Sequence, residues 1–219
     1  MPEIIIFDMD GVLVDSEPLH KELEQQLFKE LDLQITPAYY NQLVGTSPRQ
    51  MWERITSDFE LQIPVDELLQ REKELKLSEI RKLRLQLNKG VEALLKDLKK
   101  NEFRLSVGSS SPKKIIELFL EKTGIAHLFD HAVSSEEVTH GKPAPDIFLR
   151  IASLYEIAPE GLVVVEDSRN GVVAAKAAGM RCIGYVNANS GEQDLSQADL
   201  LVERFEELSP QVFQKIRKN

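Results

Sequence analysis

The stretch "EIIIFDMDGVLVDSEPLH", residues 3–20, joins an apolar run to a pair of acids. Residues 4–7 are apolar without a break, and Asp8 and Asp10 follow them with one residue between. A short, uninterrupted apolar run is typical of a strand that is buried on both faces of a sheet. Burying an unpaired carboxylate is costly. The acids at the end of this strand are therefore predicted to bind a cation, to hold a proton or to take part in a reaction.

Two further apolar runs also end in polar residues. Three serines follow the run at 104–108, and "EDS" follows the run at 162–165. Each is succeeded by a helix pattern, over 112–124 and 168–179, that ends in glycine. This alternation predicts a doubly wound, Rossmann-like α/β fold with a parallel sheet. Ligands of such sheets lie outside the carboxyl ends of the strands, where these acids and serines fall.

A long segment between the first strand and the others shows no strand pattern. Leucines recur at helical spacing near its start, and residues 65–87 are rich in Glu, Lys and Leu. We therefore predict an inserted α-helical cap over residues 17–88 and a core over residues 1–16 and 89–219. The two chain crossings would let the cap move as a lid. A closing helix is expected within residues 205–219.

Composition narrows the class of protein. The chain has 219 residues, of which 42% are hydrophobic and 29% charged, as expected for a globular protein. Its net charge of -9 argues against nucleic acid as a partner. The single cysteine, Cys182, lies in an apolar run and is expected to be buried and inert. We recognise neither a signal peptide nor a membrane span, so we expect the cytoplasm and no membrane partner.

The acids that follow the strands suggest phosphoryl chemistry. One carboxylate of the pair Asp8 and Asp10 can attack, and the other can handle a proton. Attack on a phosphate anion requires charge screening, for which Mg²⁺ held by oxygen ligands is suited. Glu166 and Asp167 offer further oxygens.

Positive charge is needed as well, and Lys142 in "HGKPAPDIF" is the candidate. Ser109 and the backbone N–H of Ser110, close to a helix N-terminus, can bind phosphate oxygens.

Taken together, the segments "DMDGVLVD", "VGSSS", "GKPAPDIF" and "VVVEDSRNGVVAAKAAGM" resemble the four motifs of the haloacid dehalogenase superfamily. The motifs occur in order and span the chain, which is far more specific than a lone pair of acids. The helical insertion resembles the cap of the β-phosphoglucomutase-like branch.

The resemblance implies a role for each residue. Asp8 would be the nucleophile that forms an aspartyl-phosphate, and Asp10 would be the general acid and then the base. Mg²⁺ would be held by Asp8, the Asp10 carbonyl and Asp167, with Glu166 assisting. The transferring phosphoryl group would be bound by Ser109 and Lys142.

Structural alternatives exist for several of these residues. The acid pair could be a structural metal site, and Lys142 could be a surface lysine. Ser109 could be an N-cap, although Ser111 is better placed to cap the helix that follows. Glu166 could orient the neighbouring ligand without binding metal itself.

Three cap residues are harder to assign. His20 is either a half-exposed helix residue or a partner of Asp10 or of a substrate hydroxyl. Arg49 is a candidate for binding the remote part of the substrate. It lies one position later than the arginine of the cap loop in the family's mutases, which weakens a mutase assignment. Lys76 is expected to be a solvated surface charge.

We therefore expect an Mg²⁺-dependent phosphatase for a small phosphorylated metabolite, such as a sugar phosphate, that is a monomer or weak dimer. A hexose-phosphate mutase with the same phosphoaspartate is the alternative. A phospho-receiver domain is a distant alternative. In receiver domains the acidic pair ends the first strand and the phosphorylated Asp ends the third, whereas in this chain the acidic pair comes late. The family's dehalogenases fit this sequence poorly, because they need neither a metal nor a second acid.

Overall fold

The computed structural model describes residues 3–40, 43 and 48–218. A parallel sheet with the strand order β3-β2-β1-β4-β5-β6 forms its centre. The strands are β1 (Ile4–Phe7), β2 (Arg104–Ser109), β3 (His131–Ser134), β4 (Leu162–Glu166), β5 (Arg181–Tyr185) and β6 (Leu200–Val202). The three apolar runs are β1, β2 and β4, and the predicted fold class is confirmed. The strand order reverses at β1, and ligands of open α/β sheets bind at such a point.

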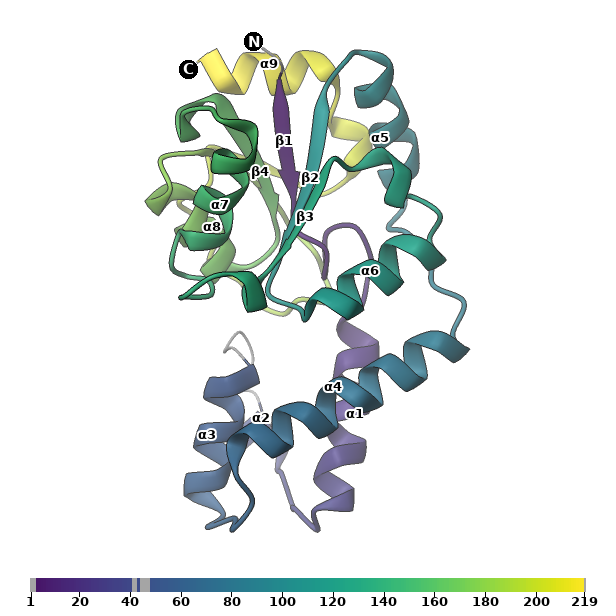
Figure 1. Cartoon of the computed structure of the whole chain (residues 1–219), viewed down its shortest axis with the longest axis vertical. Helices are drawn as coiled ribbons and strands as arrows, with labels where there is room; N and C mark the ends of the chain where they lie inside the picture. Colours follow the sequence, from purple (N-terminus) through teal and green to yellow (C-terminus); the bar gives the residue numbers. More distant parts are fainter. Residues whose placement is uncertain (1–2, 41–42, 44–47, 219) are drawn as a thin grey trace.

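Helices cover both faces of the sheet (Figure 1). One face carries α5 (Val91–Lys100), α6 (Lys113–Lys122) and α9 (Pro210–Lys218), and the other carries α7 (Asp146–Tyr155) and α8 (Arg169–Ala177). Short 3₁₀ turns are η1 (Ala126–Leu128), η2 (Ser135–Glu137), η3 (Pro159–Gly161) and η4 (Phe205–Glu207). Both faces of β1 are buried, since Ile5 and Phe7 join one cluster while Ile4 and Ile6 join the other. This double burial explains the unbroken apolar run.

The cap lies below the sheet in Figure 1 and consists of helices. These are α1 (Glu17–Glu30), α2 (Pro37–Tyr40), α3 (Pro48–Asp58) and α4 (Val65–Lys82). The cap has a hydrophobic cluster of its own around the fully buried Trp52, whose ring lies 5.8 Å from that of Phe28. The later part of α4 packs on the core, because Ile80 joins the same cluster as α6. None of the described helices is long and apolar enough to cross a membrane.

The two chain crossings between core and cap lie side by side. Val14 forms an antiparallel bridge with Leu87, and the backbone N–H of Asn88 donates to the Leu13 carbonyl at 2.9 Å. The cap is thus connected through paired segments rather than through two independent linkers. Boundaries at residues 16/17 and 88/89 agree with this pairing and remain our proposal.

Candidate active site

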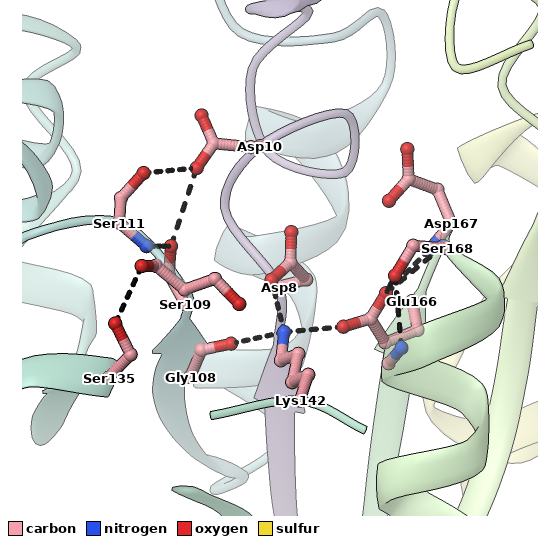
Figure 2. A network of polar contacts seen from close by, with 12 residues as sticks. Asp8, Asp10, Gly108, Ser109, Ser111, Ser135, Lys142, Glu166, Asp167 and Ser168 are labelled. Carbon is pink, nitrogen blue, oxygen red and sulfur yellow. Dashed lines mark hydrogen bonds and ion pairs between the residues drawn. The ribbon is translucent and has the colours of Figure 1, made fainter. Parts of the chain in front are cut away.

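The polar residues at the carboxyl ends of β1, β2 and β4 and just beyond them meet at one edge of the sheet (Figure 2). Phe7 is in register with both Val107 and Val165, so the next residue, Asp8, lies level with the ends of β2 and β4. The Asp8 backbone N–H extends the ladder by donating to the Val165 carbonyl at 2.9 Å. Strand register therefore brings residues far apart in the sequence to a single site.

Lys142 is the centre of the polar network at this edge. Its Nζ lies 2.5 Å from Asp8 Oδ1 and 2.5 Å from Glu166 Oε1, and it donates to the Gly108 carbonyl at 2.9 Å. Only 5% of the Lys142 side chain is exposed, so it is not a surface lysine. Burial alone would lower the pKa of Lys142, but the two carboxylates raise it above its ordinary value. The ammonium group is therefore a fixed positive charge.

Negative charge exceeds positive charge around Lys142. Asp8, Glu166 and Asp167 are all buried, and their ligand oxygens lie within 4.8 Å of one another. Burial raises the pKa of Asp8 well above its ordinary value; Lys142 opposes this, and the neighbouring carboxylates add to it. Three carboxylates around one ammonium leave a deficit of positive charge. A hard divalent cation such as Mg²⁺ fits both the charge and the all-oxygen donor set.

Glu166 is already heavily hydrogen-bonded. Its Oε1 accepts from Lys142, while its Oε2 accepts from the backbone N–H groups of Asp167 and Ser168 at 3.1 Å each and from Ser168 Oγ at 3.0 Å. A Cβ on Gly171 would lie 1.8 Å from Glu166 Oε1, so only glycine lets α8 approach this carboxylate. These contacts favour the second interpretation of Glu166, in which it orients Lys142 and Asp167.

Asp10 belongs to a separate set of contacts. Strand β1 ends at Phe7 and the chain turns at Met9, so Asp10 does not lie on an extended continuation of the strand. Asp10 Oδ1 accepts from Ser16 Oγ at 2.6 Å and lies 3.0 Å from His20 Nε2. The structure thus brings His20 to Asp10, in agreement with one of the two interpretations of His20.

Two serines at the end of β2 and just beyond it complete the surroundings of Asp10. Its Oδ2 accepts from Ser111 Oγ at 2.7 Å and, more weakly, from Ser109 Oγ at 3.4 Å (Figure 2). Burial would raise the pKa of Asp10, but hydrogen bonds from His20, Ser16 and Ser111, together with the charge of His20, lower it far below its ordinary value. In this geometry Asp10 is a carboxylate.

The serine triplet does not cap α6 as expected. Helix α6 follows Pro112 without any side-chain cap, and the hydroxyl of Ser111 donates to Asp10 instead. Ser109 is fully buried and its Oγ accepts from the Ser111 backbone N–H at 3.0 Å. Ser110 is exposed next to them, and its carbonyl accepts from Ser135 Oγ. A phosphate-binding role for Ser109 and for the Ser110 N–H remains a prediction.

The structure does not join Arg49 to this network. Arg49 lies in the first turn of α3, not in a loop, and its Nη2 pairs with Asp66 Oδ1 at 2.6 Å. Its side chain is 56% exposed. The preceding residues of "GTSP", 45–47, lie outside the described residues.

Lys76 was expected on the surface, and this expectation was wrong. Only 9% of its side chain is exposed, and Nζ lies 2.5 Å from Glu72 Oε1. Glu72 Oε2 in turn accepts from Trp52 Nε1 at 2.7 Å. A Lys/Glu-rich helix suggested a solvated face, but the i,i+4 spacing of Glu72 and Lys76 was a signal for the pair.

The sequence patterns did not reveal that Ser16 and Ser111 donate hydrogen bonds to Asp10. Ser111 was expected to cap a helix. Both serines lie in the segments that resemble family motifs or next to them, but only the folded geometry turns their hydroxyls towards Asp10.

Comparison with known proteins identifies the family. The family model of the haloacid dehalogenase-like hydrolases matches residues 5–185. A phosphorylated carbohydrates phosphatase from Thermotoga maritima is 31% identical over 208 residues, which cover 94% of this chain and 96% of the relative. The fructose-1-phosphate phosphatase YqaB from Escherichia coli is 34% identical over 185 residues, with 82% and 94% covered.

A similar solved structure is that of β-phosphoglucomutase from Clostridium difficile. Its TM-score is 0.84 at 25% identity, and the match covers 100% of this chain and 98% of that one. The sequence match, the strand order and the acid cluster agree, and the chain belongs to the haloacid dehalogenase-like hydrolases, as a phosphohydrolase of the β-phosphoglucomutase-like branch.

Proposed function

We propose that this protein is an Mg²⁺-dependent phosphatase that hydrolyses a sugar phosphate through an aspartyl-phosphate on Asp8. The carrying observation is the buried cluster in which Asp8, Glu166 and Asp167 face the single ammonium of Lys142. This arrangement pairs a carboxylate nucleophile with sites for two positive charges. The phosphatases for phosphorylated carbohydrates and for fructose 1-phosphate among the relatives support this substrate class.

The residues present suit a magnesium ion. Asp8, Asp167 and the main-chain carbonyl of Asp10 would hold it, with Glu166 orienting its neighbours. When bound, the ion would neutralise negative charge on the phosphoryl group and on the acid cluster, so that an anion can approach a carboxylate.

In the first step Asp8 attacks phosphorus and the bond from phosphorus to the sugar oxygen breaks. Lys142, Ser109 and the Ser110 N–H would bind the phosphoryl oxygens, which carry the developing charge. Asp10 would give a proton to the departing sugar oxygen. In the second step water attacks the phosphoryl group, Asp10 takes the water's proton, and Asp8 is released with inorganic phosphate.

The acid role of Asp10 requires a source of protons, because its pKa is lowered in this geometry. His20 Nε2 lies 3.0 Å from Asp10 Oδ1 and is the neighbour through which a proton can reach Asp10. In the second step the carboxylate form of Asp10 is already the form that accepts a proton. We therefore propose that Asp10 and His20 act as a proton-sharing pair.

A hexose-phosphate mutase is the second candidate, favoured by the structural likeness to β-phosphoglucomutase. A mutase returns the phosphoryl group to a sugar, and it must grip a second phosphate while it does so. Arg49, the described cap residue considered for this role, is instead exposed and paired with Asp66. This pairing favours hydrolysis. A receiver domain no longer fits, because the chain belongs to a hydrolase family and carries a helical cap.

A phosphate-release screen over many phosphomonoesters, with Mg²⁺ or with EDTA, tests the proposal. We expect release from sugar phosphates that stops in EDTA and resumes when Mg²⁺ is restored. A second assay with β-glucose 1-phosphate and a hexose bisphosphate measures glucose 6-phosphate. Efficient formation of glucose 6-phosphate with little free phosphate would replace the phosphatase by the mutase. The cytoplasmic location and the monomeric or weakly dimeric state remain predictions.

A further inference from the structure

The loop that follows β5 contributes a buried hydroxyl to the acid cluster. Ser190 is 7% exposed, and its Oγ donates to Asp167 Oδ2 at 2.5 Å. No family motif quoted above includes Ser190, since it lies 23 positions after Asp167 in the sequence. A serine hydroxyl buried against a candidate metal ligand calls for a role in the geometry of that ligand.

The same carboxylate oxygen is confined on a second side by Gly11. A Cβ on Gly11 would lie 1.9 Å from Asp167 Oδ2, and Gly11 has a φ of +78°, so no other residue fits there without displacement. Asp167 Oδ2 thus lies between the backbone of Gly11 and the hydroxyl of Ser190. With one oxygen fixed in this way, the plane of the Asp167 carboxylate is set relative to Asp8.

Other residues of the loop bind the segment that carries Asp10. Asn187 Nδ2 donates to the Gly11 carbonyl at 3.0 Å, and Asn189 Nδ2 donates to Asp15 Oδ2 at 2.6 Å. The peptide between Asp10 and Gly11 includes the carbonyl proposed above as a metal ligand. The loop therefore contacts both the side-chain ligand Asp167 and the turn that presents the backbone ligand.

Ser190 is itself anchored to the helix that follows Asp167. Gln193 Nε2 donates to the Ser190 carbonyl at 3.0 Å, and Gln193 Oε1 accepts from the Arg169 backbone N–H at 3.1 Å. Arg169 is the first residue of α8, two positions after Asp167. The hydroxyl and the carboxylate are thus held in one frame, and their contact does not depend on a freely moving loop.

We propose that Ser190 is a positioning residue for the metal site, which fixes the Asp167 carboxylate in the orientation that binds magnesium. This inference rests on the magnesium site of the proposed function. Carboxylates that bind metals are themselves hydrogen-bonded in proteins, and loss of such a partner weakens metal affinity about 10–100-fold. Ser190 would act through Asp167 and would not touch the substrate.

The test is a magnesium titration of the metal-free, full-length protein by isothermal titration calorimetry, without substrate. Ser190→Ala should bind Mg²⁺ about 10–100-fold more weakly than wild type, and Ser190→Thr, which keeps the hydroxyl, should recover most of the affinity. Ser106→Ala is the matched control, because Ser106 is also buried and its hydroxyl bonds Tyr155 Oη at 2.7 Å instead of an acid of the cluster. It should bind Mg²⁺ like wild type.

A purely structural role would lower thermal stability in both alanine variants alike and leave Mg²⁺ affinity unchanged. Equal affinity in wild type and Ser190→Ala would therefore overturn the inference while leaving the proposed function intact. If wild type bound no Mg²⁺ and released phosphate equally well in EDTA, the magnesium part of the proposed function would fail, and the inference with it. If Ser190→Ala does not fold, Ser190→Cys, a near-isosteric weak donor, replaces it.

Discussion

Core and cap each bury a lysine against carboxylates, and the two lysines differ in how their charge is balanced. In the core, Lys142 contacts Asp8 and Glu166, with Asp167 in the same cluster. In the cap, Lys76 forms its ion pair with Glu72 at 2.5 Å, and Trp52 donates to the other oxygen of Glu72; the charges of Glu24 and Asp10 also raise the pKa of Lys76. The nearby Glu24 has a pKa raised by burial, and its Oε2 accepts from the Tyr40 hydroxyl.

The difference separates one direct ion pair from a cluster in which three buried acids lie around one ammonium. Lys76 and Glu72 satisfy each other directly, as a buried ion pair that supports a fold must. The core cluster has more acid than Lys142 can balance, which raises the pKa of Asp8 through burial and through its acidic neighbours. Such an excess of buried negative charge is costly unless a cation or a proton offsets it.

The largest effect is expected for Asp8→Asn. An amide is a poor nucleophile and a poor magnesium ligand, so turnover should fall on the order of 10⁶-fold, the loss seen when a covalent nucleophile is removed from a hydrolase. Steady-state phosphate release measures it, and circular dichroism should show an intact fold. Asp66→Asn, at a carboxylate that is 82% exposed in the cap, is the control and should keep wild-type turnover. Near-normal activity of Asp8→Asn would contradict the account.

Asp10→Ala should reduce turnover by about 10²–10⁴-fold on sugar phosphates, the usual worth of general acid–base catalysis. The loss should be smaller on p-nitrophenyl phosphate, because its leaving group needs little protonation. Comparing kcat for the two substrates in one enzyme preparation is the measurement. Equal losses on both substrates would argue against Asp10 as the acid.

Replacing the two lysines tests the comparison itself. Lys142→Met should lower kcat by about 10²–10³-fold, because a fixed positive charge at the phosphoryl group is lost. Lys76→Met should leave kcat for p-nitrophenyl phosphate close to wild type but cost about 3–5 kcal/mol of folding free energy, because Glu72 becomes an unpaired buried charge. Urea unfolding and phosphate release are measured on both variants. Loss of kcat without loss of stability in Lys76→Met would assign Lys76 to the active site.

A smaller effect is expected in the pH dependence of stability without metal. The pKa of Asp8 is raised above its ordinary value of 3.8, so the folded protein holds a proton that the unfolded chain has released. Stability in EDTA should therefore fall as pH rises from that value through the raised pKa, by about 1.4 kcal/mol for each pH unit that separates the folded and unfolded pKa values. Asp199 has a lowered pKa, so its contribution to stability is lost as pH falls below 3.8. This change lies outside the pH range of the Asp8 effect and has the opposite sign.

Urea unfolding in EDTA between pH 5 and pH 8, on wild type and Asp8→Asn, provides the measurement. The variant should lack this part of the slope and should be the more stable protein at the upper end. Added Mg²⁺ should stabilise wild type most at the upper end of this pH range, where Asp8 no longer has to release a proton to bind the ion. Parallel curves for the two proteins would show that the excess acid at Asp8 has no influence on folding.

The sequence predicts the site better than its surroundings. Strands that are buried on both faces leave an unbroken apolar run in the sequence. The positions of Asp8 and Glu166 could therefore be located from the pattern of apolar residues alone. Once the strands are parallel, their ends must meet, and the motifs around Lys142 and Asp167 follow from the family resemblance. Strands β3 and β6 could not be found in this way, because they are only 4 and 3 residues long and the first two residues of each are not buried.

Contacts between loops were beyond the reach of sequence patterns. Ser111 satisfies a common capping rule on paper but bonds Asp10 in the folded chain. Ser190 reaches Asp167 only because β5 lies next to β4 and its loop turns back over the sheet edge. Lys76 was misassigned since burial of a helix face depends on what packs against it. Local patterns indicate elements, whereas partners of polar side chains depend on tertiary structure.

The most direct test of the central claim is to locate the phosphoryl group during turnover. Wild type and Asp10→Ala are mixed with substrate and Mg²⁺, quenched in acid within milliseconds, reduced with borohydride and analysed by peptide mass spectrometry. Borohydride converts an aspartyl-phosphate to homoserine, and the account predicts homoserine at position 8 and nowhere else, only when substrate and Mg²⁺ are both present. Modification at another residue, or an unmodified Asp8 in both proteins while phosphate is being released, would contradict it.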